Sequence, residues 1–190
     1  MVDIHAWSKS RTDELLDLRE EISFVDLDRI ILLGQQIVKA FKSGNKLAFL
    51  GNGGSAAEAS HLATEFVSKC TVEHPPLNAI CLNDSQSSIT AIGNDYGFDF
   101  IFERLVRAHL REGDVLIALS TSGRSSNVLR ALNSASKLGV MVVLWTGINK
   151  PDLSDVEVWN CRLRQTPRIQ EVHLLWGHLL SEFVEIHFSN

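Results

Sequence analysis

The sequence predicts an α/β fold, a three-layer sandwich in which a central parallel sheet of five strands is flanked by helices in a flavodoxin-like, doubly wound arrangement, with further helices at the N-terminus. Short apolar runs alternate with amphipathic stretches, and strands that alternate with helices form parallel sheets. Two of these runs lead directly into glycine-rich or hydroxyl-rich loops, which such sheets place at the carboxyl ends of their strands. The chain has 190 residues, 45% hydrophobic and 22% charged, so we expect one domain, residues 1–190.

The N-terminal region, residues 1–45, is predicted to be helical. Residues 12–22 carry leucines and an isoleucine on a helical period. A second helix is expected to begin near Asp26 or Asp28 and to end at residues 43–45. The broad apolar faces of these helices suit packing on the α/β core or on a neighbouring subunit, and the sequence leaves both alternatives open.

The apolar runs predict the strands, and the amphipathic stretches between them predict the helices. The strands are expected at residues 47–50, 79–82, 115–119, 140–145 and 156–160. The helices that follow are expected from Ser55, from residues 83–85 to Ile92, at 100–110, from the loop 120–127 to Leu138, and at 169–186. The segment 93–98 between two of these helices is predicted to be a loop.

The stretch from Gly51 to Glu65, GNGGSAAEASHLATE, is predicted to be a strand-to-helix turn that binds an anion. Gly51, Gly53 and Gly54 break the first strand, Ser55 is the expected helix N-cap, and Glu58 completes a capping-box spacing. Glycines let backbone amides approach a ligand, and a helix N-terminus adds free N–H groups and a positive dipole end. The sequence therefore predicts a cradle for a phosphate or a sugar phosphate.

A second loop of this kind, STSGRSSN at residues 120–127, follows the third predicted strand. A single Ser/Thr-rich loop is more often a solvated turn than a binding site. Two such loops at the same edge of a sheet favour a binding site, so we predict a second anion cradle here. Neither loop matches the Walker A or the dinucleotide-binding pattern, and nucleotide binding is therefore set aside.

Polar side chains on two predicted helices are candidates for a metal site. His61 and Glu65 are four residues apart and project from one helix face, although such a pair is often only a surface contact. The mostly apolar last helix carries Gln170, His173 and His178, and a buried histidine with a satisfied hydrogen bond is a simple alternative for either histidine. Gln170 and His178 lie about 12 Å apart along the helix axis, so both reach one ion only if it sits between them.

Charge, hydropathy and cysteine content exclude several classes of protein. The net charge of −5 argues against a nucleic-acid partner, and no apolar run approaches the ~20 residues of a membrane span. Cys70, Cys81 and Cys161 are odd in number and lack metal-motif spacing, and the N-terminus has no apolar signal segment. Reduced thiols and a cytoplasmic location fit these features best.

Four motifs together resemble the phosphoheptose isomerases of the sugar isomerase (SIS) domain class. They are GNGGSAAEASHLATE, AIGNDYGF, ALSTSGRSSNVLRAL and RIQEVHLLWGH, and the resemblance covers nearly the whole chain. It implies an aldose–ketose isomerase that converts sedoheptulose 7-phosphate to D-glycero-D-manno-heptose 7-phosphate, the first step towards the heptose of bacterial surface polysaccharides. It also implies a cytoplasmic homotetramer with active sites at subunit interfaces.

The resemblance also implies roles for individual residues. It makes His61, Glu65, Gln170 and His178 the ligands of one zinc ion per subunit, and it makes Glu65 and His178 the catalytic pair. We expect Glu65 to be the base and His178 the acid or a second base. The implied substrate contacts are Asn52, Gly53, Gly54, Ser55, Glu65, Asn94, Asp95, Ser120, Thr121, Ser122, Ser125 and Gln170. Because the ligands are nitrogen and oxygen donors, another divalent metal is an open alternative.

Departures from the family pattern at Glu58, at Pro167 and in the loop after Gly147 leave the particular sugar phosphate open. One alternative is therefore an isomerase of another long-chain sugar phosphate. Two others are a non-catalytic tetrameric scaffold that binds the bacterial replication initiator protein and a module that senses sugar phosphates. Retention of the implied metal ligands and catalytic pair favours the enzyme.

Overall fold

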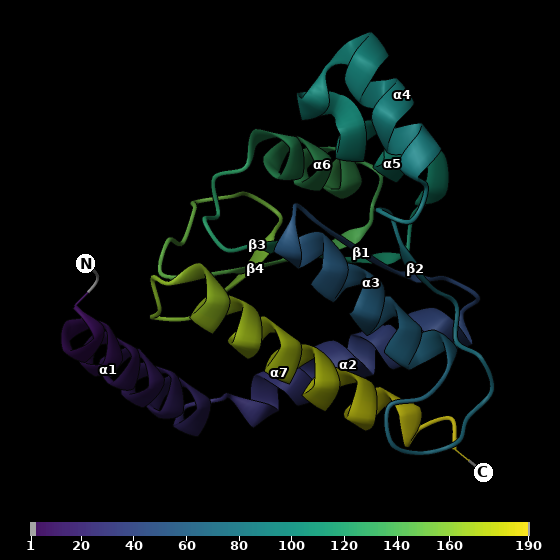
Figure 1. Cartoon of the computed structure of the whole chain (residues 1–190). Coiled ribbons are helices and arrows are strands. Elements are labelled where there is room, and N and C mark those ends of the chain that lie inside the picture. The colour runs from purple at the N-terminus through teal and green to yellow at the C-terminus, as the bar shows by residue number, and fades with distance from the viewer. Residues whose placement is uncertain (1–2, 190) are drawn as a thin grey trace.

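The computed structural model describes residues 3–189 and confirms the predicted parallel sheet of five strands, in the order β2-β1-β3-β4-β5 (Figure 1). Residues 1, 2 and 190, which the one-domain prediction includes, lie outside the described residues. The strands are β1 (Leu47–Gly51), β2 (Ala79–Cys81), β3 (Val115–Ser120), β4 (Met141–Thr146) and β5 (Glu157–Asn160). The order is that of a flavodoxin-like, doubly wound sheet.

Helices cover both faces of the sheet. They are α1 (Ile4–Ser23), α2 (Leu27–Lys42), α3 (Gly54–Val67), α4 (Gln86–Tyr96), α5 (Ile101–His109), α6 (Ser126–Lys137) and α7 (Thr166–Glu185), with the short 3-10 helix η1 (Phe98–Phe100) before α5. Figure 1 shows α2, α3 and α7 on one face of the sheet and α4, α5 and α6 on the other. The structure therefore has the three layers predicted from the sequence, with helices on both faces of the sheet.

Alternating strand residues build the two halves of the core. Leu47 and Phe49 of β1 join the cluster beneath α2, α3 and α7, whereas Ala48 and Leu50 join the cluster beneath α5 and α6. All four residues are fully buried. A strand buried on both faces has no polar alternation, which is why these strands appear in the sequence as continuous apolar runs.

Helices α3 and α7 lie side by side and run in the same direction (Figure 1). A Cβ placed on Gly177 of α7 would lie 2.2 Å from Cδ2 of Leu62 on α3, so only glycine allows this close approach. Helix α7 begins at Thr166, three residues before the predicted start, because Pro167 occupies its first turn, where a missing N–H is tolerated. This pair of helices carries the candidate metal ligands.

The predicted start of α3 was wrong. The N-cap is Gly53, at φ 57° and ψ −120°, and no side chain caps the helix. Serine rarely adopts this left-handed conformation, so the helix begins at the glycine and Ser55 lies inside its first turn. The predicted capping box is therefore absent, and Glu58 is buried instead, with 6% of its surface exposed.

The predicted loop at residues 93–98 was also wrong, because α4 continues to Tyr96. Gly97, at φ 95°, ends the helix in a backbone conformation that suits glycine. Asn94 and Asp95 therefore lie in the last turn of a helix.

Helix α1 is longer than predicted, and Asp3 caps it by accepting hydrogen bonds from the backbone N–H groups of His5 and Ala6. No residue of α1 is buried. Helix α2, in contrast, packs against α7 and contributes Leu33 and Ile37 to the core. The two predicted N-terminal helices thus differ in how they contact the rest of the chain.

Candidate active site

The two predicted cradles lie at the same edge of the sheet, as the sequence predicted. Strands β1 and β3 are parallel neighbours, with Gly51 paired to Leu119, and both loops follow the carboxyl ends of these strands. In the order β2-β1-β3, the strand sequence reverses between β1 and β3, and sheets of this type bind ligands at such a switch point.

A side chain from the neighbouring strand fixes the start of the glycine turn. Oδ1 of Asn83 accepts a hydrogen bond from the Gly51 N–H at 3.1 Å, and Nδ2 of Asn83 donates to the Gly51 carbonyl at 2.9 Å. Sequence reasoning assigned Asn83 only to a helix cap. Its position directly after β2, at the same edge of the sheet as both cradles, could have identified it as a residue of the site.

A reciprocal pair of amides joins the two cradles. Nδ2 of Asn52 donates to Oδ1 of Asn127 at 2.9 Å, and Nδ2 of Asn127 donates to Oδ1 of Asn52 at 3.0 Å. Asn52 belongs to the predicted substrate contacts, but Asn127, which is 2% exposed, was missed. The pair ties the glycine turn to the first turn of α6.

The second cradle presents hydroxyl groups at the start of α6. Ser120 ends β3, and its Oγ lies 3.3 Å from Oγ of Ser125, the N-cap residue of α6. The Ser125 side chain makes no capping bond, so its hydroxyl does not compete with a ligand for the first N–H groups of the helix. Oγ of Ser122 accepts a hydrogen bond from the Arg124 N–H at 3.2 Å. Together with Thr121, these groups could bind an anion at the helix N-terminus.

The structure brings His61, Glu65 and His178 together across the α3–α7 interface. Their ligand atoms all lie within 4.8 Å of one another. Nε2 of His61 is 2.9 Å from Nε2 of His178, and Nδ1 of His61 is 3.5 Å from Oε1 of Glu65. His61 is exposed, whereas Glu65 and His178 are partly buried. Three of the four ligands that the resemblance implies therefore lie close together.

These three side chains fit a divalent metal ion. Two nitrogens bound to one tetrahedral zinc would lie about 3.3 Å apart, close to the distance between the two Nε2 atoms. Two imidazoles and a carboxylate form a donor set common at zinc sites that retain an open position. The cluster could therefore hold zinc, and its nitrogen and oxygen donors also suit other divalent metals.

The structure places Gln170, the fourth predicted ligand, at the start of α3. A Cβ on Gly54 would lie 2.3 Å from Nε2 of Gln170, so the amide rests against the helix backbone there. Gln170 also faces Glu58, as does Ser55. Burial raises the pKa of the Glu58 carboxyl to about 7, which the Ser55 and Gln170 side chains lower only in part. Neither Glu58 oxygen has a hydrogen bond of ordinary geometry.

Asn94 and Asp95 do not join this cluster within one chain. Both are exposed on α4, which covers the face of the sheet opposite to α3 and α7 (Figure 1). Nδ2 of Asn94 donates to Oδ1 of Asp95 at 2.7 Å. Their contact with a substrate remains a prediction.

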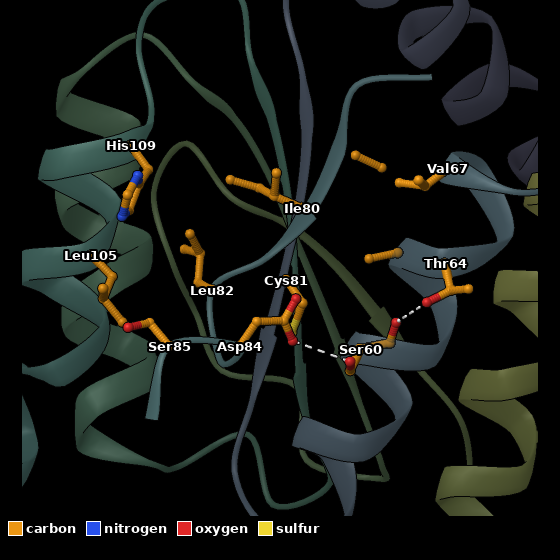
Figure 2. Close-up of a pocket in the computed structure, with 12 residues that line it drawn as sticks. Ser60, Thr64, Val67, Ile80, Cys81, Leu82, Asp84, Ser85, Leu105 and His109 are labelled. Carbon is orange, nitrogen blue, oxygen red and sulfur yellow. Dashed lines mark hydrogen bonds between the residues drawn. The ribbon is translucent and has the colours of Figure 1, made fainter. Parts of the chain in front are cut away.

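A cavity lies on another face of α3. Figure 2 shows this cavity, of about 500 Å³, beside the edge strand β2 and between α3 and α5. Ile80, Leu82 and Leu105 line it, and Ser60 donates a hydrogen bond to Oδ1 of Asp84 at its rim. His61, Glu65 and His178 are not among its lining residues, so the candidate site is a different region.

Comparisons with known proteins agree with this fold. The family model of the SIS domain matches residues 12–147. The phosphoheptose isomerase of Rhodospirillum rubrum is 47% identical over 151 residues, which cover 78% of this chain and 80% of the relative. That of Aquifex aeolicus is 43% identical over 169 residues, which cover 87% and 88% of the two chains.

Solved structures of phosphoheptose isomerases have the same fold. The Neisseria gonorrhoeae structure is 30% identical with a TM-score of 0.82, and the match covers 96% of this chain and 98% of that one. The Francisella tularensis structure is 28% identical with a TM-score of 0.88, covering 98% and 100%. The chain belongs to the SIS domain proteins and, among them, to the phosphoheptose isomerase family, as its motifs predicted.

Two further findings concern membrane-spanning helices and the state of the cysteines. None of the helices within residues 3–189 is long and apolar enough to cross a membrane. Cys70, Cys81 and Cys161 are free thiols, and the latter two are buried.

Proposed function

We propose that this protein is a metal-assisted aldose–ketose isomerase that converts sedoheptulose 7-phosphate to D-glycero-D-manno-heptose 7-phosphate. The observation that carries this proposal is the His61–Glu65–His178 cluster, formed by α7 and by the helix that follows the glycine turn. The curated relatives named above, both phosphoheptose isomerases, support the choice of substrate.

The two cradles bind the two ends of the substrate. The hydroxyls of Ser120, Thr121, Ser122 and Ser125, with the N-terminus of α6, hold the phosphate. The glycine turn at residues 52–55 and Gln170 hold the sugar near its carbonyl. Asn94 and Asp95 complete the contacts from another subunit, because one chain does not bring them to the cluster. The Asn52–Asn127 pair keeps the two cradles in a fixed relation.

Glu65 and His178 carry out the proton transfers. In the ketose, the Glu65 carboxylate removes a proton from C1, and the electron pair of that C–H bond forms the C1–C2 double bond of an enediolate. His178 moves a proton between O1 and O2, and return of a proton to C2 gives the aldose. A carboxylate and an imidazole at the same site suit these two tasks, because a carboxylate accepts a proton and an imidazole can both accept and donate one.

One zinc ion per subunit is the proposed cofactor, held by His61, Glu65, His178 and Gln170. When bound, such an ion polarises the substrate carbonyl and stabilises negative charge on its oxygen. The ligand atoms of the two histidines and the glutamate already converge, which supports this assignment.

A cytoplasmic homotetramer with active sites at subunit interfaces is the proposed assembly. Helix α1 has no buried residue and exposes large apolar side chains, which favours a partner surface. The position of Asn94 and Asp95 on the far side of the sheet also favours a site completed by a second subunit. The three free thiols suit the reducing cytoplasm.

A coupled assay with sedoheptulose 7-phosphate tests the proposed reaction. Wild-type protein of known metal content is compared with Glu65→Gln, which keeps the shape of the side chain but cannot act as a base. We expect a loss in kcat of about 10²–10⁴-fold, the usual contribution of a general base, with an unchanged thermal midpoint.

Turnover of the variant within a few fold of wild type would contradict the role of Glu65. Absence of turnover by a zinc-loaded wild-type protein would contradict the proposed substrate. In that case, the same assay with other long-chain ketose phosphates would separate a different substrate from a protein without isomerase activity.

A further inference from the structure

Glu58 is a buried carboxylate between the glycine turn and the metal-ligand cluster. Glu58, His61 and Glu65 share one face of α3 by the helical period, and Glu58 lies roughly 4–5 Å before His61 along the axis. Only 6% of Glu58 is exposed, and neither of its oxygens has a hydrogen bond of ordinary geometry. A buried carboxyl without a hydrogen bond of ordinary geometry is costly, so an apolar side chain would serve the core better. This position therefore calls for a role outside core packing.

Gln170 is the α7 side chain that faces Glu58. A Cβ on Gly54 would lie 2.3 Å from Nε2 of Gln170 but 3.3 Å from Oε1, so the nitrogen end of the amide is turned toward α3. Glycine at position 54 is what leaves room for this contact. The amide thus lies against the start of α3, on the side that faces the Glu58 carboxyl.

The two ends of a glutamine amide differ chemically. Nε2 donates hydrogen bonds, whereas Oε1 accepts them and is the atom that can bind a metal ion. When Glu58 is ionised, it only accepts hydrogen bonds, and the orientation that is then favoured directs Nε2 to Glu58 and Oε1 away from it. Carboxylates outside the ligand set orient metal ligands in many proteins.

We propose that Glu58 is a positioning residue that holds Nε2 of Gln170 and thereby aims Oε1 at the divalent ion of the His61–Glu65–His178 cluster. This inference rests on the proposed function, because it takes Gln170 to be a ligand of that ion. Glu58 itself contacts neither the ion nor the substrate. Its removal therefore weakens ion binding through Gln170 alone.

Zinc affinity, measured on the full chain by competition with a chromogenic chelator, tests this role. Glu58→Leu removes the acceptor, and we expect zinc to bind 10–100-fold more weakly, the usual cost of losing such a partner. Glu58→Gln keeps an acceptor oxygen and is expected to retain most of the affinity. The thermal midpoint of metal-free Glu58→Leu should equal or exceed that of wild type, because desolvation of the buried carboxyl costs more than its interaction with Gln170 returns.

A double-mutant cycle shows whether the effect passes through Gln170. In a Gln170→Leu background, Glu58→Leu should cause no further loss of zinc affinity. Independent losses that multiply would overturn the route through Gln170, and wild-type affinity in Glu58→Leu would overturn the proposal itself.

A matched control is Asp114→Asn. Asp114 is fully buried, and it accepts hydrogen bonds from Lys46 and Arg111 at the opposite edge of the sheet. Its variant should lose stability without losing zinc affinity. A comparable loss of affinity in this control would show that Glu58→Leu acts through general damage to the fold, and would overturn the proposal.

The same measurements distinguish a failure of the role proposed for Glu58 from a failure of the proposed metal centre. Zinc binding by wild type that is lost in His178→Leu supports the centre, whatever Glu58 does. A wild-type protein that does not bind zinc overturns the centre and this inference with it. Zinc binding that is intact in both wild type and Glu58→Leu overturns only the role of Glu58.

Discussion

Glu185 shows how a single side chain holds an irregular segment in place. This carboxylate, at the end of α7, is 1% exposed and accepts hydrogen bonds from the backbone N–H groups of Cys70, Thr71 and Val72 at 3.0, 2.9 and 3.1 Å. The Thr71 hydroxyl also donates to it. Burial acts to raise the pKa of Glu185, but these hydrogen bonds outweigh it and lower the pKa below its usual value. The chain after α3 is thus tied to α7.

We predict that Glu185→Gln destabilises the protein in a pH-dependent way. A lowered folded-state pKa means that the charged side chain adds stability above its unfolded pKa and loses it as pH falls through the folded value. The deficit of the variant should be about 1–3 kcal/mol at pH 7 and should shrink below about pH 4. Urea unfolding at several pH values measures it.

Nε2 of His74 lies 3.8 Å from Oε2 of Glu185. Because His74 is present in both the wild type and Glu185→Gln, the difference in their free energies of unfolding reports on Glu185. A deficit that stays constant from pH 7 to pH 3 would contradict the prediction.

At the scale of elements, the α3–α7 pair determines whether a site exists. The contact between His61 and His178 depends on how the two helices align, and glycines set how closely they approach. Leu62, beside His61, contacts Gly177, beside His178. The residues that pack at the helix interface are therefore the sequence neighbours of the residues that form the cluster.

Gly177→Ala is predicted to destabilise the protein by about 1–3 kcal/mol, the cost of overpacking a close interface. The new Cβ would lie 2.2 Å from Cδ2 of Leu62, a fully buried side chain with little room to move, and we expect the helices to separate and His178 to shift relative to His61. Thermal unfolding and zinc affinity should therefore both fall.

Gly93→Ala in α4 is the control for this prediction. There the nearest atom to a new Cβ is 3.8 Å away, an ordinary contact, and the change should stabilise the helix by roughly 0.4–1 kcal/mol. Equal stability of Gly177→Ala and wild type would show that the interface tolerates separation.

At the scale of the whole molecule, α1 lacks the burial that the other long helices have. Ile4, Trp7, Leu15 and Ile22 share one face by the helical period and are 73%, 57%, 52% and 45% exposed. Adjacent α2 and α7 are anchored in the core. The apolar face of α1 therefore suits the proposed contact between subunits.

Leu15→Glu is predicted to convert the proposed tetramer to smaller species, because a carboxylate buried at an interface without a partner is costly. Light scattering coupled to size exclusion measures the mass of the particle. Ser10→Glu adds the same charge away from that face and should leave the mass unchanged. A tetramer that persists in Leu15→Glu would exclude this face from the assembly.

Much of the fold could be predicted because its signals are local. Apolar runs predicted the strands, and most residues of these strands are buried in the core of the structure. Helix ends were harder to predict. At Gly53 a left-handed glycine begins α3 where a serine cap was expected, and at Glu58 packing against α7 replaced the capping pattern.

The candidate site was less accessible to sequence reasoning because its contacts join distant segments. Asn83 contacts Gly51 and Asn127 contacts Asn52 across 32 and 75 residues of chain, and no local pattern reports such contacts. His61 and His178 could each be singled out as polar residues on apolar helices. Their meeting follows from the parallel packing of α3 and α7, which only the fold specifies.

The paired asparagines at positions 52 and 127 have a consequence for selectivity. Their two hydrogen bonds set the span between the glycine turn and the hydroxyl loop. If one sugar phosphate is held at both loops, the distance between them selects the number of carbons between its carbonyl and its phosphate. A sugar one carbon shorter would then engage one end or the other, but not both.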